Sequence, residues 1–141
     1  MKKILIASHG EMANGVASTI KIIAGTNENI QTISAYTENI DLDEELDKFI
    51  SSIKSNDEVF VFTDLYGGSV NQKITLKFTE KSIKANIIAG FNIAVILEII
   101  LSSKKLNDSD INEIIKRSRM ELKKSQLINE ETVNESDEFF N

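Results

Sequence analysis

Short apolar runs and longer amphipathic stretches alternate along the chain. The apolar runs cover residues 3–8, 30–36, 57–64 and 84–90. Runs of this length predict strands that are buried on both faces, as the strands of a parallel sheet are. The stretches after them have apolar residues at helical spacing and predict helices over residues 14–24, 41–54, 70–79, 93–103 and 109–123.

The helices differ in how their side chains are distributed. One apolar face of the first helix is formed by Val16, Ile20, Ile23 and Ala24, and one face of the second by Leu42, Leu46, Phe49, Ile50 and Ile53. The last helix has acids early and bases late, as the helix dipole favours; these are Asp110, Glu113, Arg117, Arg119, Lys123 and Lys124. Helix 93–103 is apolar nearly all round, with Glu98 its only charge. Such a helix is either wholly buried or lies in a subunit contact, and we favour a contact and hence a homodimer.

Repeated strand–helix units predict a doubly wound α/β fold with helices on both faces of a mainly parallel, four-stranded sheet. With the strand order 2-1-3-4, the ligand-binding crevice lies beyond the carboxyl ends of strands 1 and 3. His9 ends strand 1 and Asp64 ends strand 3, so the fold is expected to bring these two residues together, although 55 positions separate them.

The length of 141 residues suits one domain, which we place at residues 1–128, followed by an acidic tail at 129–141 that we expect to be mobile. The tail holds five of the 22 acids, which leaves 17 acids against 16 bases in the other 128 residues. The body is therefore nearly neutral and has no polybasic stripe for nucleic acid. The chain has no cysteine and a single histidine, which leaves almost no ligands for structural zinc. No apolar run approaches a membrane-spanning length, and the N-terminal residues do not form a signal peptide, so we expect a cytoplasmic protein.

The single histidine is the main candidate for chemistry. A carboxylate that accepts a hydrogen bond from one imidazole nitrogen leaves the other nitrogen free as a nucleophile, and Asp64 is the candidate carboxylate. The following Gly67-Gly68-Ser69 sequence allows close approach of a phosphoryl group, with Ser69 as a hydroxyl donor. From position alone, His9 as a hydrogen-bonded strand end and Asp64 as a helix cap remain an open alternative.

Other kinds of site are compatible with parts of the same sequence. Residues 10–17 have the glycines of a P-loop but lack its lysine and the hydroxyl residue after it. A Ser69-His9-Asp64 hydrolase triad remains a minority interpretation, because Asp64 and Ser69 share one loop. A receiver domain would use Asp64 as its phosphorylated residue, but it needs an acidic pair where this chain has Ser8 and His9. A pure interaction module that uses the apolar helix at residues 93–101 is the last alternative.

The combination of ASHG, FTDLYGGSVN and GFNIAVI, at the ends of strands 1, 3 and 4, resembles the mannose-class enzyme IIA (EIIA) domain of the bacterial phosphoenolpyruvate-dependent sugar phosphotransferase system. The similarity runs from residue 1 to about 125. It implies a phosphohistidine phosphotransferase that accepts a phosphoryl group from HPr and passes it to enzyme IIB during sugar uptake through membrane IIC and IID subunits. It also implies a homodimer and requires neither a metal nor a cofactor.

Carried over by motif, the resemblance makes His9 the phosphoryl acceptor and Asp64 its orienting carboxylate. Gly68, Ser69 and Asn92 are then expected to bind the phosphoryl group, Asn92 at the edge of the site. The family commonly has prolines where this chain has Val70 and Ala94, which points to the same reaction with a more mobile loop. In the family, a fifth, antiparallel strand is usually exchanged between subunits. Whether this chain exchanges such a strand is left open here, because residues 118–128 lack the usual glycines. The related phosphocarrier domain of dihydroxyacetone kinase systems is a second possibility.

Overall fold

The computed structural model describes residues 1–25 and 29–129. The strands of this part are β1 (Lys2–His9), β2 (Ile30–Ala35), β3 (Glu58–Thr63) and β4 (Asn86–Ala89). Its helices are α1 (Met12–Ala24), α2 (Leu42–Ser51), α3 (Ser69–Glu80), α4 (Ile93–Leu101) and α5 (Asp108–Arg119). Each predicted strand and helix is therefore present, with shifts of a few residues at the ends.

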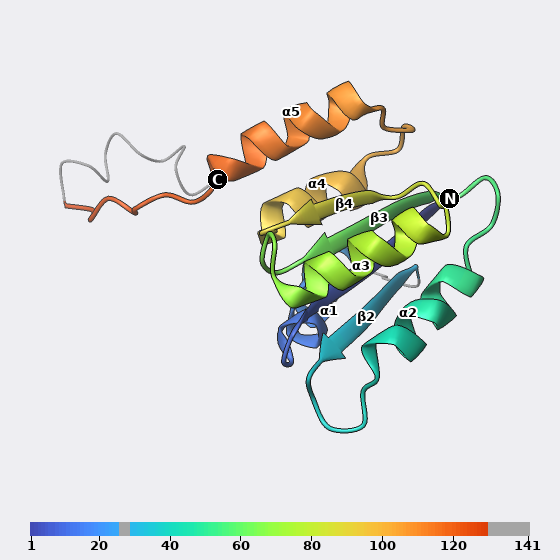
Figure 1. The fold of residues 1–141 in the computed structure, drawn as a ribbon. Coiled ribbons are helices and arrows are strands. Elements are labelled where there is room, and N and C mark those ends of the chain that lie inside the picture. The colour runs from blue at the N-terminus through green and yellow to red at the C-terminus, as the bar shows by residue number, and fades with distance from the viewer. Residues whose placement is uncertain (26–28, 130–141) are drawn as a thin grey trace.

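The four strands form one parallel sheet in the order β2-β1-β3-β4, which confirms the predicted order (Figure 1). In its register, His9 of β1 pairs with Ala35 of β2, and Ala7 of β1 pairs with Thr63 of β3. The last residues of the three strands therefore lie at the same edge of the sheet. This register brings the loops that follow β1, β2 and β3 together.

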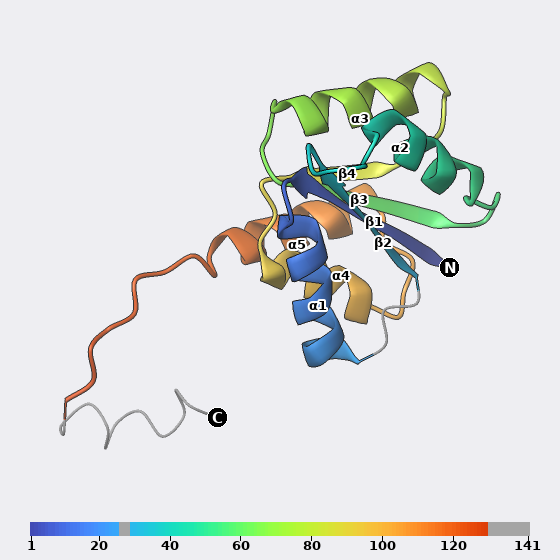
Figure 2. The same ribbon diagram turned by 90° about the horizontal axis from the view of Figure 1, so that it is seen from below.

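Helices cover both faces of the sheet (Figure 2). On β1, Ile4 and Ile6 belong to the core that packs against α1, α4 and α5, whereas Leu5 and Ala7 face the core under α2 and α3. All four side chains are almost completely buried. A strand buried on both faces has to be apolar throughout, which explains why β1 reads as a continuous apolar run.

Helix α1 corrects one detail of the predicted core. Val16 and Ile20 are buried as expected, but Ile23 is exposed. Ala24, four residues after Ile20, packs against the core as predicted. Ala13 lies one residue before the predicted start of the helix, but it belongs to α1 and is also buried in the core.

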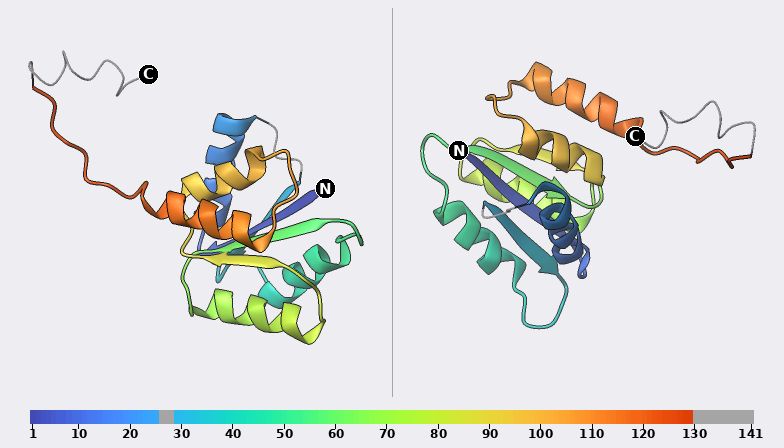
Figure 3. Two further views of the ribbon diagram at one scale, coloured as in Figure 1. Left: turned by 90° about the horizontal axis from the view of Figure 1, so that it is seen from above. Right: turned by 180° about the vertical axis from the view of Figure 1, so that it is seen from behind.

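Helix α4 lies between α1 and α5 (Figure 3). Its residues Val95, Ile96 and Ile99 are buried, while Leu101 at its end is exposed. Much of its apolar surface is thus covered within the chain itself. The predicted subunit contact through this helix stays a prediction.

Helix α5 ends at Arg119, so the expectation that Lys123 and Lys124 lie in its last turn is wrong. The carbonyl of Ser118 accepts hydrogen bonds from the Asn92 side chain, at 2.7 Å, and from the Glu121 backbone, at 3.1 Å, and these contacts close the helix. The segment after it, up to residue 129, runs away from the body (Figures 1 and 3). It forms no fifth strand within residues 1–25 and 29–129. The predicted mobile tail falls, from residue 130 on, outside the described residues.

Candidate active site

His9 is held at the end of β1 by a tight turn into α1. Gly10 has a left-handed backbone, with φ of 63°, and its N–H donates to the carbonyl of Ala35 at 2.8 Å. The Ser8 hydroxyl accepts a hydrogen bond from the Ala13 N–H, at 2.8 Å, and so joins the end of the strand to the first turn of α1. The backbone on both sides of His9 is therefore fixed.

Asp64 fixes the imidazole ring and the backbone of His9 together. Its Oδ2 lies 2.8 Å from the His9 backbone nitrogen and 2.8 Å from Nδ1 of the ring, and its Oδ1 accepts from the Leu65 N–H at 3.0 Å. The Asp64 side chain is only 9% exposed, against 39% for His9. The structure thus brings together the two residues that the sequence placed at neighbouring strand ends.

The Asp64 carboxyl is kept ionised by these contacts. Burial raises its pKa, but the hydrogen bonds from the His9 backbone and ring and the charge of the ring lower the pKa by more, so the net shift is downward. An ionised Asp64 accepts a hydrogen bond from the Nδ1–H of His9. Nε2 then carries the free electron pair of the ring.

Nε2 faces the loop that follows β3. The Ser69 hydroxyl oxygen lies 3.3 Å from Nε2, at the first residue of α3. The first turn of a helix has backbone N–H groups without partners inside the helix, and these favour an anion. A group on Nε2 would therefore lie next to a hydroxyl and the positive end of α3.

The two glycines serve different purposes in this loop. Gly67 has a φ of 75°, which disfavours other residue types. Gly68 has an ordinary φ of −70°, but a Cβ there would lie 3.2 Å from Cβ of Leu65 and 3.6 Å from Cε1 of His9. Gly68 therefore allows the loop to pass close to the imidazole.

Two polar side chains of α3 keep the loop in place. Asn71 accepts from the Gly67 N–H at 3.1 Å and donates to the Thr63 hydroxyl at 3.0 Å. Gln72 donates to the Gly67 carbonyl at 2.5 Å. The sequence analysis did not assign these supporting residues.

Asn92 has a different position from the other predicted site residues. Its Oδ1 accepts from the Val95 N–H at 2.9 Å and caps α4, while its Nδ2 donates to the Ser118 carbonyl at 2.7 Å. It lines a hollow of about 980 Å³ between α3, β4 and α5, which Gly67 also lines and which does not include His9. Both polar atoms of Asn92 thus hold helices, and its predicted contact with a phosphoryl group stays a prediction.

Tyr36 is the residue at this site that the sequence analysis missed. It follows Ala35 at the end of β2, and its hydroxyl lies 2.7 Å from the Ser69 hydroxyl. Its ring centroid is 5.4 Å from that of His9. The strand order could have pointed to Tyr36. Because β2 is a neighbour of β1, the residue that follows β2 lies close to His9 at the end of β1.

Two properties of the described residues bear on the type of site. Within residues 1–25 and 29–129, His, Cys, Asp and Glu side chains do not gather in groups of three or more that could hold a metal ion. In the same part of the chain, no helix is long and apolar enough to cross a membrane.

Comparison with known proteins finds a family model and several solved structures of IIA components. The family model described as the PTS system fructose IIA component, EIIA-man, matches residues 3–118. The phosphotransferase system component EIIA from Streptococcus agalactiae is 25% identical, with a TM-score of 0.74 over 88% of this chain and 97% of that chain. The PTS IIA protein associated with the fucose utilization operon of Streptococcus pneumoniae is 28% identical, with a TM-score of 0.70 over 87% and 92%.

A more distant structure agrees in fold. The mannose/sorbose specific IIA subunit from Enterococcus faecalis is 21% identical, with a TM-score of 0.71 over 92% of this chain and 98% of that chain. The family model covers most of the chain, including both loops that meet at His9. The chain therefore belongs to the EIIA-man family, the IIA components of the sugar phosphotransferase system.

Proposed function

We propose that this chain is a IIA phosphocarrier in which His9 accepts a phosphoryl group from HPr and passes it to an enzyme IIB of a mannose-class sugar transporter. The observation that carries the proposal is the environment of the imidazole. Nδ1 is 2.8 Å from the Asp64 carboxylate, while Nε2 lies on the side of the ring that faces Ser69. A ring held in this way has Nε2 as the nitrogen that is available as a nucleophile.

The proposed transfer balances without another reactant. The electron pair of Nε2 attacks phosphorus, and the bond between phosphorus and the carrier's own histidine nitrogen breaks. That electron pair stays with the carrier's imidazole. The Nδ1 proton remains hydrogen-bonded to Asp64, which stabilises the positive charge that develops on His9. In the transfer to enzyme IIB, His9 is the leaving group: a nucleophile of enzyme IIB attacks phosphorus, the bond between phosphorus and Nε2 breaks, and its electron pair returns to Nε2.

Gly68, Ser69 and the start of α3 are proposed to bind the phosphoryl oxygens. Because the group passes between two similar imidazoles, the protein contributes mainly position and charge stabilisation. The backbone N–H groups of the first turn of α3 and the Ser69 hydroxyl supply donors on one side of Nε2. His9 is partly exposed, so a partner's histidine can approach without a large movement of the loops.

The partners follow from this role. HPr and enzyme IIB are the proposed direct partners, and membrane IIC and IID subunits are associated indirectly through IIB, with this chain acting in the cytoplasm. We further infer that the chain works as a homodimer. Support comes from Leu122 and Leu127, which are almost fully exposed on the segment after α5, and from β4, which pairs only with β3 in the described part of the chain. Sedimentation of the intact chain measures this directly.

A hydrolase is the second candidate because Ser69, His9 and Asp64 are connected in the order of a catalytic triad. The Ser69 hydroxyl lies 3.3 Å from Nε2, and Nδ1 contacts Asp64. Membership of the IIA family favours the phosphocarrier. The two candidates differ in the atom that becomes modified, which is a nitrogen of His9 in one case and the oxygen of Ser69 in the other.

Phosphorus NMR separates the candidates. The protein is incubated with phosphoenolpyruvate, enzyme I and HPr, and the expected product is a phosphohistidine that is labile in acid and stable in alkali. The His9→Ala variant is expected to lose all labelling, because it has no other histidine. Equal labelling of parent and variant would contradict the assignment of His9. Turnover of an ester substrate that is lost in Ser69→Ala, without any phosphohistidine in the parent, would favour the hydrolase.

A further inference from the structure

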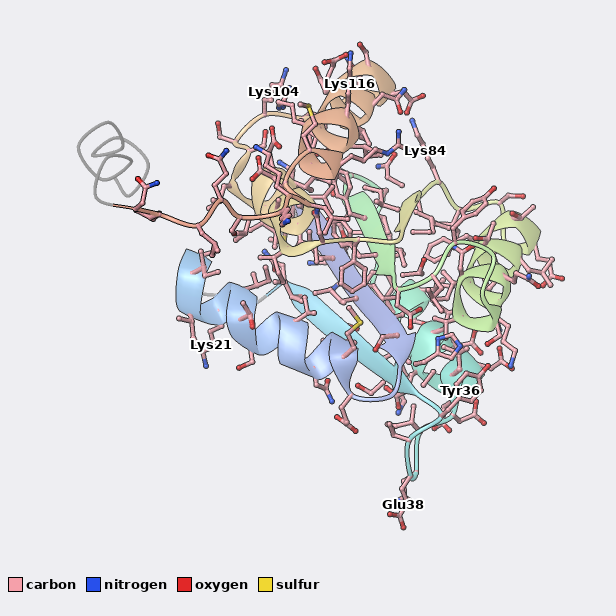
Figure 4. The ribbon with its side chains drawn as sticks, turned by 90° about the vertical axis from the view of Figure 1, so that its left-hand side faces the viewer. Lys21, Tyr36, Glu38, Lys84, Lys104 and Lys116 are labelled. Carbon is pink, nitrogen blue, oxygen red and sulfur yellow. The ribbon has the colours of Figure 1, made fainter. Side chains whose placement is uncertain are left out.

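Tyr36 occupies an unusual backbone position beside His9. Its φ is 64°, and only Asn39 and Ser82 share a positive φ among the non-glycine residues described. A bulky side chain is uncommon in this left-handed region, and such outliers persist where the surrounding structure holds them. Figure 4 shows Tyr36 near the carboxyl end of the sheet, whereas Glu38 of the same loop points into solvent. The strained position is therefore next to the proposed nucleophile.

The Tyr36 side chain is held by groups of the active site. Its hydroxyl is 2.7 Å from the Ser69 oxygen, which is itself 3.3 Å from Nε2 of His9. The Tyr36 and His9 rings lie 5.4 Å apart, with an angle of 35° between their planes. Because the residue is 59% exposed, filling of the core does not explain these contacts.

Helix α3 offers two side chains to Tyr36 from one face. Ser69 and Lys73 are four residues apart, so they lie one above the other on the helix. The Lys73 ammonium is 5.6 Å from the centroid of the Tyr36 ring, in reach of a cation–π contact. The Tyr36 side chain is therefore contacted from one face of α3 at both its hydroxyl and its ring.

These contacts leave one consistent arrangement of protons when His9 is neutral. Nδ1 donates to Asp64, so Nε2 accepts, and Ser69 is the hydroxyl that donates to it. The Ser69 oxygen can then accept from the Tyr36 hydroxyl. Hydrogen bonds in such a chain polarise one another, so the Tyr36 donor strengthens the Ser69 donor.

We propose that Tyr36 is a positioning residue for phosphoryl transfer, which holds and polarises the Ser69 hydroxyl so that this hydroxyl points at Nε2 and, after transfer, at an oxygen of the phosphoryl group. The proposal rests on the phosphocarrier function proposed above. It adds the loop after β2 to the two loops, after β1 and β3, that form the site. Tyr36 acts only through Ser69.

The first test needs no phosphoryl transfer. His9 is the only histidine, so labelling of histidine with ¹⁵N gives two ring signals in the NMR spectrum. Tyr36→Phe is expected to shift the Nε2 signal and to leave the Nδ1 signal, which reports on Asp64, unchanged. Tyr66→Phe is the matched control, because Tyr66 is the only other tyrosine and is 90% exposed. An unchanged Nε2 signal in Tyr36→Phe would overturn the proposal.

The second test measures how Tyr36 and Ser69 depend on each other. The equilibrium of phosphoryl exchange with HPr is followed by phosphorus NMR in the parent, Tyr36→Phe, Ser69→Ala and the double variant. Tyr36→Phe is expected to lower the phosphorylated fraction, as an about fivefold change in the equilibrium constant. The same change is expected to disappear in the Ser69→Ala background. An equal effect in both backgrounds would show that Tyr36 does not act through Ser69.

The two proposals fail in distinguishable ways. If the parent and Tyr66→Phe take no phosphoryl group at all, the phosphocarrier function is wrong, and the ¹⁵N measurement still decides whether Tyr36 positions Ser69 on Nε2. If both are phosphorylated and Tyr36→Phe has the same equilibrium constant as they have, the function stands and the role of Tyr36 is wrong. Thermal unfolding of each variant separates a loss of fold from a loss of transfer.

Discussion

The two sides of α3 show how differently one helix can be used. One side faces His9, where a carboxylate, an imidazole and two hydroxyls form a chain of contacts of 2.7 to 3.3 Å. The other side borders the hollow beside β4, whose walls include the apolar residues Leu76, Ile87, Phe91, Val95 and Ile115. The side that faces His9 thus presents converging polar groups, whereas the other side borders a mainly apolar surface.

The hollow beside β4 and the proposed site at His9 are separate. The hollow of about 980 Å³ lacks His9, Asp64 and Ser69, although it is lined by Gly67 of the same loop. The one predicted site residue on that side, Asn92, has both polar atoms engaged with helix ends. Substitutions on the side of α3 that faces His9 are therefore expected to affect phosphoryl transfer. Substitutions on the other side are expected to affect folding.

The largest effect among substitutions that keep His9 is expected for Asp64→Asn. The amide that replaces the carboxylate can offer an oxygen to only one of the two sets of N–H groups, those of His9 or that of Leu65, and it cannot balance a positive ring. We expect the rate of phosphoryl transfer from HPr to fall about 100-fold. Rapid-quench measurement of the rate tests this.

The control for Asp64→Asn is the free energy of unfolding from denaturant titration. Loss of one acceptor for a partly buried donor should lower this free energy by about 1–3 kcal/mol, so the fold is retained. An unchanged transfer rate in a folded variant would remove Asp64 from the mechanism. The surroundings of His9 would then differ from the hollow beside β4 in polarity but not in chemistry.

The sequence was sufficient to predict the sheet order and the pairing of His9 with Asp64, because buried parallel strands are continuous apolar runs and their ends meet at a known edge. Tyr36 was not predictable in the same way. Its role depends on a left-handed backbone after β2 and on the rotation of α3 that turns Ser69 toward it. Neither property is expressed in hydrophobic spacing.

The end of α5 gives a second example of this limit. The charge pattern continued to Lys124, but the helix ends where the Asn92 side chain binds the carbonyl of Ser118. A hydrogen bond between residues 26 positions apart has no local sequence signal. Asn92 lies near the end of β4, as His9 and Asp64 lie at the ends of β1 and β3. Unlike them, it uses its side chain to bind the ends of α4 and α5.

An intermediate effect is expected for Gly68→Ala, which tests how closely the loop must approach His9. Gly68 has a backbone open to alanine, but the new Cβ would lie 3.2 Å from Leu65 Cβ and 3.3 Å from the Leu65 carbonyl oxygen. The turn must move by a few tenths of an ångström, and it carries Ser69 with it. We expect an about tenfold slower phosphoryl transfer, because small misplacements of reacting groups have large effects on rate.

Gly15→Ala is the matched control for this substitution. Gly15 lies inside α1, and a Cβ there has no atom within 4 Å. Alanine should stabilise the helix by about 0.5–1 kcal/mol and leave the transfer rate unchanged. If Gly68→Ala transfers as fast as Gly15→Ala, the close approach of the loop to the imidazole has no part in catalysis.

The smallest effect on transfer is expected for Asn92→Ala. Asn92 lines the hollow on the other side of α3. Removal of the cap of α4 and of the contact with Ser118 should lower the free energy of unfolding by about 1–3 kcal/mol. The transfer rate should stay at the parent value, because the bonds to Val95 and Ser118 already engage both polar atoms. Asn107→Ala, which removes the cap of α5, provides a matched loss of a helix cap. If Asn92→Ala slows transfer and Asn107→Ala does not, Asn92 reaches the phosphoryl group as the family resemblance predicts, and the two sides of α3 share one site.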